Sequence, residues 1–218
     1  GEHTYPIVDY IPRFVGEHNY ADNFGFQWNK FKPTQLDSHS HLPISADRYW
    51  AATRWLPEQL NGKWVLDAGC GAGRFAEVAL DAGANVVAID FSNAVDACRD
   101  NLLHHPNLYV VQADIYSLPF LEASFDYVYS LGVVQHTPDV KETVRSLCDM
   151  VGEGGEICFD VYWKRLRTIC QPKYLLRPIT KRMNDESLFK LLEQAVPYLL
   201  GLSEVFRRVP LIGNQLKK

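Results

Sequence analysis

The chain of 218 residues is 47% hydrophobic and 12% aromatic, and its formal net charge at pH 7 is −4. This composition predicts one main folded domain with attached segments and excludes an intrinsically disordered chain. The five cysteines form no C-x-x-C pair and have no histidine at metal-ligand spacing, and no apolar run is long enough to span a bilayer. We therefore expect a soluble, reduced, cytoplasmic protein with no metal site and no secretory leader.

Charge is distributed unevenly along the chain. Residues 1–160 carry 10 Lys+Arg and 22 Asp+Glu, a balance of −12, whereas residues 161–218 carry 12 and 4, a balance of +8. The acidic body argues against a general nucleic-acid surface. The basic tail has two readings, a surface for an anionic substrate, membrane or partner, or only the solvated side of helices.

The first third of the chain predicts three elements. Residues 5–15 have β-type composition broken by two prolines, which favours a short hairpin at a sheet edge. Residues 45–60 have helical spacing, with Ser45 as the expected N-cap. The intervening segment 19–36 is both aromatic and polar, and we expect it to form a lid over an acceptor through Tyr20, Phe24, Phe26 and Trp28.

A hydrophobic strand ending at Ala68 leads into three alternating glycines, Gly69, Gly71 and Gly73, and then into a helix. Alternating glycines allow tight turns and leave no Cβ between backbone and ligand, while the helix N-terminus presents unpaired N–H groups. The pattern therefore predicts a nucleotide-type cofactor site. A dinucleotide fingerprint would place its third glycine at position 74, where this chain has Arg74, so the spacing favours a different ligand.

Further buried strands are expected to end near Asp90, Asp114, Ser130 and Phe159. Helices predicted at 74–82, 92–104 and 139–150, and a short helix before the fourth strand, separate them. This alternation predicts an α/β fold with a Rossmann-like, mostly parallel sheet and helices on both faces, carrying an aromatic N-terminal extension and a helical C-terminal segment. Right-handed crossovers would place the strand-end acids and Ser130 along one edge of the sheet.

The run from Asp67 to Gly73 resembles the first motif of class I S-adenosylmethionine-dependent methyltransferases. Four later motifs follow in that family's order, so the resemblance covers about residues 60–162. It is strongest to the small-molecule branch that includes ubiquinone and menaquinone methyltransferases. The resemblance implies S-adenosyl-L-methionine as cofactor, S-adenosylhomocysteine as product and methyl transfer to a small molecule, with the acceptor atom (O, N or C) left open.

The resemblance also implies roles for single residues. Asp67 would lie near the methionine ammonium, Asp90 would accept the two ribose hydroxyls, and Asp114 would lie beside the adenine amino group. Helix capping is the alternative role for Asp90 and Asp114, and capping of the glycine loop is the alternative for Asp67. The remaining cofactor-binding candidates are the adenine neighbours Phe91 and Ile115, the loop residues Gly69, Cys70, Gly71, Gly73 and Arg74, and Ser130 and Leu131 beside the methyl donor.

Two further roles concern charge and proton transfer. Arg74 is a candidate for binding the cofactor carboxylate, with Arg48 and Tyr20 as rivals. His136 is a candidate general base, although a histidine in this loop is common in the family without being catalytic. Gln135 is expected on the acceptor side.

These patterns divide the chain into an extension and lid (1–44), a cofactor-binding core (45–162) and a basic helical segment (163–218) that is a cap or an insertion. The family's sheet closes with two further strands, and no convincing pair precedes Lys218. Two other functions remain open, a nicotinamide-dependent oxidoreductase and a non-catalytic module of a larger protein. The expected partners are a small-molecule acceptor and, through 163–218, an anionic or membrane surface, with no specific nucleic acid and an undetermined oligomeric state.

Overall fold

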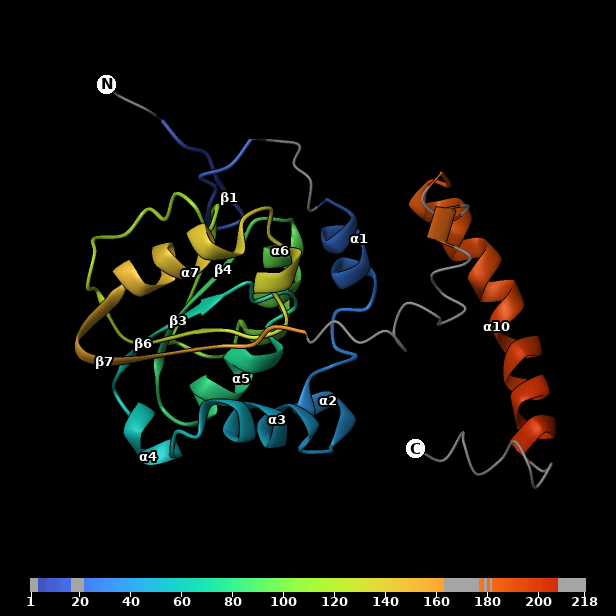
Figure 1. Ribbon diagram of the computed structural model, residues 1–218, viewed down its shortest axis with the longest axis horizontal. Coiled ribbons are helices and arrows are strands. Elements are labelled where there is room, and N and C mark those ends of the chain that lie inside the picture. Colours follow the sequence, from blue (N-terminus) through green and yellow to red (C-terminus); the bar gives the residue numbers. More distant parts are fainter. Residues whose placement is uncertain (1–3, 17–21, 163–176, 179, 181, 208–218) are drawn as a thin grey trace. The chain divides into compact units, whose positions relative to one another are not determined.

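The computed structural model describes residues 4–16, 22–162, 177, 178, 180 and 182–207 (Figure 1). Residues 1–163 form one compact unit and residues 164–218 a second. In the second unit, helix α10 (Asp185–Arg207) confirms the predicted helical C-terminal segment. No helix in the described part of the chain combines the length and the apolar character needed to cross a membrane.

The first unit is built on a five-stranded sheet whose strands are all parallel. Its spatial order is β5-β4-β3-β6-β7. The bounds are β3 (Trp64–Ala68), β4 (Asn85–Asp90), β5 (Leu108–Gln112), β6 (Phe125–Ser130) and β7 (Val151–Phe159). The order changes direction at β3, because β4 pairs on one side of it and β6 on the other. This arrangement confirms the predicted Rossmann-like fold and places a crevice at the carboxyl end of β3.

Helices cover both faces of the sheet (Figure 1). Val65 packs with α3 (Ile44–Thr53), α5 (Arg74–Asp81) and α6 (Ala94–Leu102), whereas the next residue, Leu66, packs with α7 (Val140–Asp149). Successive side chains of a strand point to opposite faces, so a strand buried on both sides reads as a nearly continuous apolar run. For this reason β3 and β4 could be predicted from the sequence.

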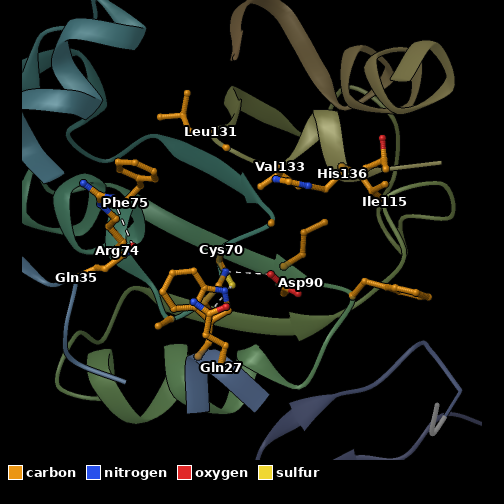
Figure 2. A pocket seen from close by; sticks show the side chains of 18 of the residues that line it. Gln27, Gln35, Cys70, Arg74, Phe75, Asp90, Ile115, Leu131, Val133 and His136 are labelled. Atoms are coloured by element: carbon orange, nitrogen blue, oxygen red, sulfur yellow. Dashed lines mark hydrogen bonds between the residues drawn. The ribbon is translucent and has the colours of Figure 1, made fainter. Parts of the chain in front are cut away.

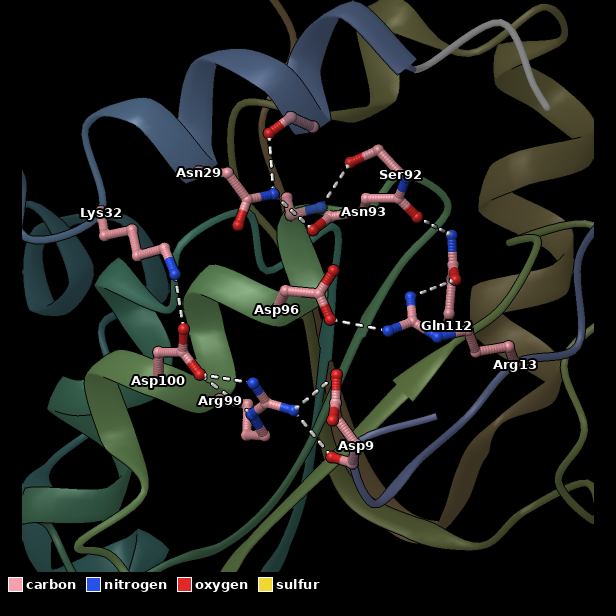
Figure 3. A network of polar contacts seen from close by, with 12 residues as sticks. Asp9, Arg13, Asn29, Lys32, Ser92, Asn93, Asp96, Arg99, Asp100 and Gln112 are labelled. Carbon is pink, nitrogen blue, oxygen red and sulfur yellow. Dashed lines mark hydrogen bonds and ion pairs between the residues drawn. The ribbon is translucent and has the colours of Figure 1, made fainter. Parts of the chain in front are cut away.

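The N-terminal segment contains the predicted hairpin, made of β1 (Ile7–Val8) and β2 (Ile11–Pro12) in antiparallel pairing. The chain then forms α1 (Asp22–Lys30), which lies beside α6. Figure 3 shows how polar side chains attach both elements to α6. Arg13 binds Asp96 at 2.6 Å, and the side-chain amide of Asn29 donates to the backbone oxygen of Asn93 at 2.7 Å. The extension is thus fixed to the same helix layer that supports the glycine loop.

Three local predictions were wrong. The expected single helix over 45–60 is divided into α3 and α4 (Pro57–Leu60), because Arg54 adopts a left-handed conformation (φ 59°) and Pro57 starts a new helix. Ser45 is not the N-cap but lies inside α3. A short helix, α2 (Asp37–Ser40), precedes α3 in the chain. The short helix expected between β5 and β6 is absent, and turns connect these strands.

Candidate functional site

A cavity of about 390 Å³ opens where the chain leaves the carboxyl ends of the central strands. Figure 2 shows Arg74 and Phe75 at one end of this cavity and Ile115 and His136 at the other. The glycine loop and Asp90 lie between them. Parallel strands bring their carboxyl ends to one edge, so residues that are far apart in the chain meet there.

Glycine is needed at the three loop positions for different structural reasons. All three have positive φ, at 92°, 53° and 91° for Gly69, Gly71 and Gly73. A Cβ on Gly69 would lie 2.4 Å from a Val133 methyl group, and one on Gly73 would lie 2.7 Å from a Leu102 methyl group. Gly69 and Gly71 line the cavity, whereas Gly73 does not and instead allows the loop to approach α6.

Helix α1 covers the glycine loop from outside. The position of a Cβ on Gly71 is 3.2 Å from Nε1 of Trp28, and both Gln27 and Trp28 line the cavity. Phe26 is 38% exposed and does not line it. The side chain of Phe24 and all of Tyr20 lie outside the described residues. Of the predicted aromatic contacts, the structure therefore brings Trp28 to the cavity.

Asp90 ends β4 and faces the cavity. Its Oδ2 accepts the Gly71 N–H at 3.0 Å, and its Oδ1 accepts both the N–H and the hydroxyl of Ser92 at 2.9 and 2.7 Å. Burial raises the pKa of Asp90, and the hydrogen bonds from Ser92 and Gly71 partly offset that increase. These bonds connect the carboxylate to the glycine loop and fix its orientation.

Asp67 lies within β3 and is buried behind the cavity wall, with only 2% of its surface exposed. Its Oδ2 has no hydrogen-bond partner in the described part of the chain. Burial raises the pKa of Asp67 to about 8, with a smaller upward contribution from Asp90. The nearby Tyr129 hydroxyl lowers the pKa again in part, although the two groups are not in hydrogen-bonding geometry. Asp67 is thus a buried acid whose Oδ2 lacks a hydrogen-bond partner among the described residues.

Two arginines, Arg48 and Arg74, both contact the ring of Phe75. The guanidinium carbon of Arg48 is 5.3 Å from the centre of the Phe75 ring, and that of Arg74 is 4.9 Å from it. Arg74 donates to the Ser45 hydroxyl at 2.9 Å and lies 3.5 Å from Oε1 of Gln35. Burial lowers the pKa of Arg74, and the neighbouring charge of Arg48 lowers it further. Both arginines line the cavity.

Another wall of the cavity comes from the connection after β6, which includes η1 (Val134–His136), and from Tyr162 after β7. The rings of His136 and Tyr162 are perpendicular, with centres 6.1 Å apart. The other residues of this wall are Leu131, Gly132, Val133 and Thr137.

Several predicted site residues do not line the cavity. Asp114 accepts the Tyr116 N–H at 3.0 Å, which shapes the turn after β5, and the Ser130 hydroxyl donates to the Ala68 backbone oxygen at 2.8 Å. The amide atoms of Gln135 are buried without a hydrogen-bond partner among the described residues. The predicted residues that do line it are Gly69, Cys70, Gly71, Arg74, Asp90, Phe91, Ile115, Leu131, His136 and Trp28.

The sequence analysis missed a second group of cavity residues. Gln27, Gln35, Val133 and Tyr162 line the cavity although no motif singles them out. Gln27 and Gln35 lie inside the aromatic segment 19–36, and Tyr162 follows a predicted strand. Only the folded chain shows that these residues converge.

Residues 66–159 match the family described as a methyltransferase domain. The chain carries a class I S-adenosylmethionine-dependent methyltransferase domain. Over 95 residues it is 38% identical to a malonyl-[acyl-carrier protein] O-methyltransferase of Pseudescherichia vulneris, covering 44% of this chain and 37% of that relative. Over 144 residues it is 28% identical to a ubiquinone biosynthesis O-methyltransferase of Pseudomonas fluorescens, covering 62% of each. The chain thus spans less than two thirds of the length of these relatives.

This chain is similar to a crystal structure described as a putative S-adenosyl-L-methionine-dependent methyltransferase from Methanococcus maripaludis. The TM-score is 0.54 at 16% identity, covering 86% of this chain and 88% of that one. At this identity the likeness concerns the fold.

Proposed function

We propose that this chain binds S-adenosyl-L-methionine in the cavity and transfers its methyl group to a small-molecule acceptor. The observation that carries the proposal is the placement of Asp90, whose carboxylate is bonded to the Gly71 N–H while it lines the cavity. A carboxylate at the end of the second strand suits two vicinal ribose hydroxyls. The O-methyltransferase relatives support an oxygen acceptor.

Two features of the structure fit a bound sulfonium cofactor. The unpartnered Oδ2 of Asp67 offers a buried carboxyl oxygen that the cofactor's ammonium would satisfy, directly or through water, and the nearby cation would favour the ionised form of this acid. Gly69 and Gly71 present bare backbone to the cavity, where a ligand can approach closely. We assign Phe91 and Ile115 to the adenine, since both line the cavity, and Asp114 to its amino group as a more distant neighbour.

Arg74 is assigned to the cofactor carboxylate. It opens α5 immediately after the glycine loop, so its guanidinium and the helix N-terminus both favour a negative group there. Ser45 and Gln35 hold the guanidinium in place. A planar guanidinium binds a carboxylate through paired N–H groups, which fixes orientation as well as charge.

When bound, S-adenosylmethionine supplies a methyl group on a positively charged sulfur that is already activated for in-line attack. The protein's task is then to align the acceptor and to exclude water. Trp28, Phe75, Leu131 and Val133 give the cavity apolar walls for this purpose. His136 is the candidate to take a proton from an oxygen acceptor, because imidazole exchanges protons near neutral pH.

Calorimetric titration with S-adenosylmethionine, S-adenosylhomocysteine and NAD⁺ tests the proposal. We expect both adenosyl compounds to bind with a Kd of about 1 µM or lower, which is roughly −8 kcal/mol, and NAD⁺ not to bind. Binding of NAD⁺ alone would favour an oxidoreductase, and no binding of either adenosyl compound at millimolar concentration rejects the proposal. Transfer of a labelled methyl group to small molecules of a cell extract then separates an enzyme from a non-catalytic module.

We further propose a cytoplasmic location. In the described residues Cys70, Cys98, Cys148 and Cys158 are all free thiols, which suits a reducing compartment. Contact of residues 163–218 with an anionic or membrane surface stays a prediction, supported by the +8 charge balance of residues 161–218.

A further inference from the structure

The cavity contains a small polar corner around Gly132 that the cofactor assignment does not use. Gly132 has φ 80°, and a Cβ placed on it would lie 3.6 Å from Nη2 of Arg48 and 3.8 Å from the hydroxyl of Tyr162. All three residues line the cavity, and His136 lies next to Tyr162. The corner therefore brings a guanidinium and a phenol to one point that only a hydrogen atom of the protein occupies, with the His136 imidazole beside the phenol.

Asp160 holds this corner in place. Its Oδ2 accepts Nη2 of Arg48 at 2.9 Å, and its Oδ1 accepts the backbone N–H of Gly132. Arg48 has no other hydrogen bond in the described part of the chain, so its Nη1 and Nε groups are available as donors. The side chains of Arg48 and Asp160 are each about one third exposed, so Asp160 orients Arg48 without removing it from solvent. Asp160 itself does not line the cavity.

The corner presents donors and no acidic side chain. Among the described residues that line the cavity, Asp90 is the one carboxylate, and it is bonded to the glycine loop rather than to this wall. The Tyr162 side chain is 60% exposed, and its hydroxyl is able to donate. In the proposed function Arg74 binds the cofactor's carboxylate at the start of α5. Arg48 is a second guanidinium at the cavity, with Asp160 bonded to its Nη2 and no role in that assignment.

We propose that Arg48 and Tyr162, with His136 beside them, bind a carboxylate group of the methyl acceptor. The inference rests on the proposed function, because it requires the cofactor to occupy the glycine-loop side of the same cavity. Guanidinium and hydroxyl donors that converge on one point match the two oxygens of a carboxylate. Because Asp160 offsets part of the Arg48 charge, the corner selects acids over neutral analogues by tens of fold rather than by thousands.

The test uses the protein saturated with S-adenosylhomocysteine and two matched pairs of probes, one aromatic and one aliphatic. These are 4-hydroxybenzoate with 4-hydroxybenzamide, and hexanoate with hexanamide. Ligand-observed NMR at pH 7.5 measures the affinity of each probe. We expect at least one acid to bind ten-fold or more tightly than its amide, and Arg48→Gln to bring the two affinities within about two-fold of each other. Tyr162→Phe should reduce the ratio about three-fold.

Arg54→Gln is the matched control, since Arg54 is an exposed arginine just after α3 that does not line the cavity. It should leave the acid-to-amide ratio unchanged. The proposal is overturned if neither acid binds, if the ratio survives Arg48→Gln, or if Arg48→Gln weakens S-adenosylhomocysteine as strongly as Arg74→Gln does. In the last case Arg48 serves the cofactor. Failure of the unmodified protein to bind S-adenosylhomocysteine at all would instead reject the proposed function.

Discussion

The two sides of the cavity are built in different ways. The glycine-loop side comes from one continuous run, Gly69 to Phe75, together with Asp90 at the end of the neighbouring strand. The other side gathers Arg48, His136 and Tyr162 from segments that lie far apart in the chain. One side is therefore defined by backbone conformation and the other by side-chain convergence. The difference suggests that the first side tolerates few substitutions, whereas the second can change with the acceptor.

Replacing Gly69 should have the largest effect, because its Cβ would overlap Val133 while its φ of 92° disfavours any side chain. We expect Gly69→Ala to lower the free energy of unfolding by about 3–5 kcal/mol, combining backbone strain with overpacking. Urea denaturation measures the change. Gly154→Ala is the control, since Gly154 has φ 74° and open space around its Cβ position, and it should cost only about 1–2 kcal/mol. Equal losses in the two variants would contradict the predicted contact with Val133.

Asp90→Ala should weaken S-adenosylmethionine by about 1.5–3 kcal/mol, because two ribose hydroxyls lose a charged acceptor. The Gly71 N–H loses its partner as well, so part of the loss reflects a less ordered loop. Calorimetry measures the affinity, and circular dichroism checks that the variant is folded. An unchanged Kd in a folded variant would mean that Asp90 only caps the turn through Ser92.

The buried Asp67 should make stability depend on pH. Its pKa is raised from 3.8 to about 8 in the folded state, so the folded protein binds more protons than the unfolded chain between these values. The free energy of unfolding should therefore fall as the pH rises from about 4 to 8, and the stabilisation by the protonated acid is lost above that range. Asp67→Asn should be more stable than the unmodified protein at pH 8.5 by about 1–2 kcal/mol.

Urea denaturation at pH 5 and pH 8.5 measures this difference. The titratable groups near Asp67 are Tyr129, Tyr49, Asp90 and Cys70, and burial raises the pKa of both tyrosines. Tyr129→Phe serves as the control, because it removes a neighbouring hydroxyl without removing the acid. Equal pH dependence in the Asn variant and the unmodified protein would show that Asp67 does not titrate in this range.

Trp28→Ala should have the smallest effect, a three- to ten-fold weaker binding of S-adenosylhomocysteine, or roughly 1 kcal/mol. The side chain covers Gly71 from α1 but makes no charged contact with the loop. Phe26→Ala is the matched control, since Phe26 is on the same helix and outside the cavity. Hydrogen exchange should also show α1 protected when the ligand binds. If α1 gains no protection while the glycine loop does, the segment is not a lid.

The contrast between the two sides also explains how much could be predicted from the sequence. The strands could be predicted because burial on both faces requires a run of apolar residues. The glycine loop could be predicted because positive φ favours glycine. Gly73 was placed in the loop correctly, but its contact with Leu102 depends on how α6 packs. The break after α3 had a local signal in Pro57, whereas the position of Tyr162 at the cavity depends on tertiary contacts for which no local pattern exists.

The hairpin near the N-terminus has a consequence for self-association. Strand β5 is at the edge of the sheet, and Arg13 forms a parallel bridge with its last residue, Gln112, while the Phe14 N–H donates to the Gln112 backbone oxygen at 2.7 Å. Arg13 also bonds the Gln112 side chain at 2.8 Å. An uncovered edge strand is a template on which another chain can add a strand. The hairpin thus shields one end of this edge, and a protein that lacked it would be more prone to form intermolecular sheets.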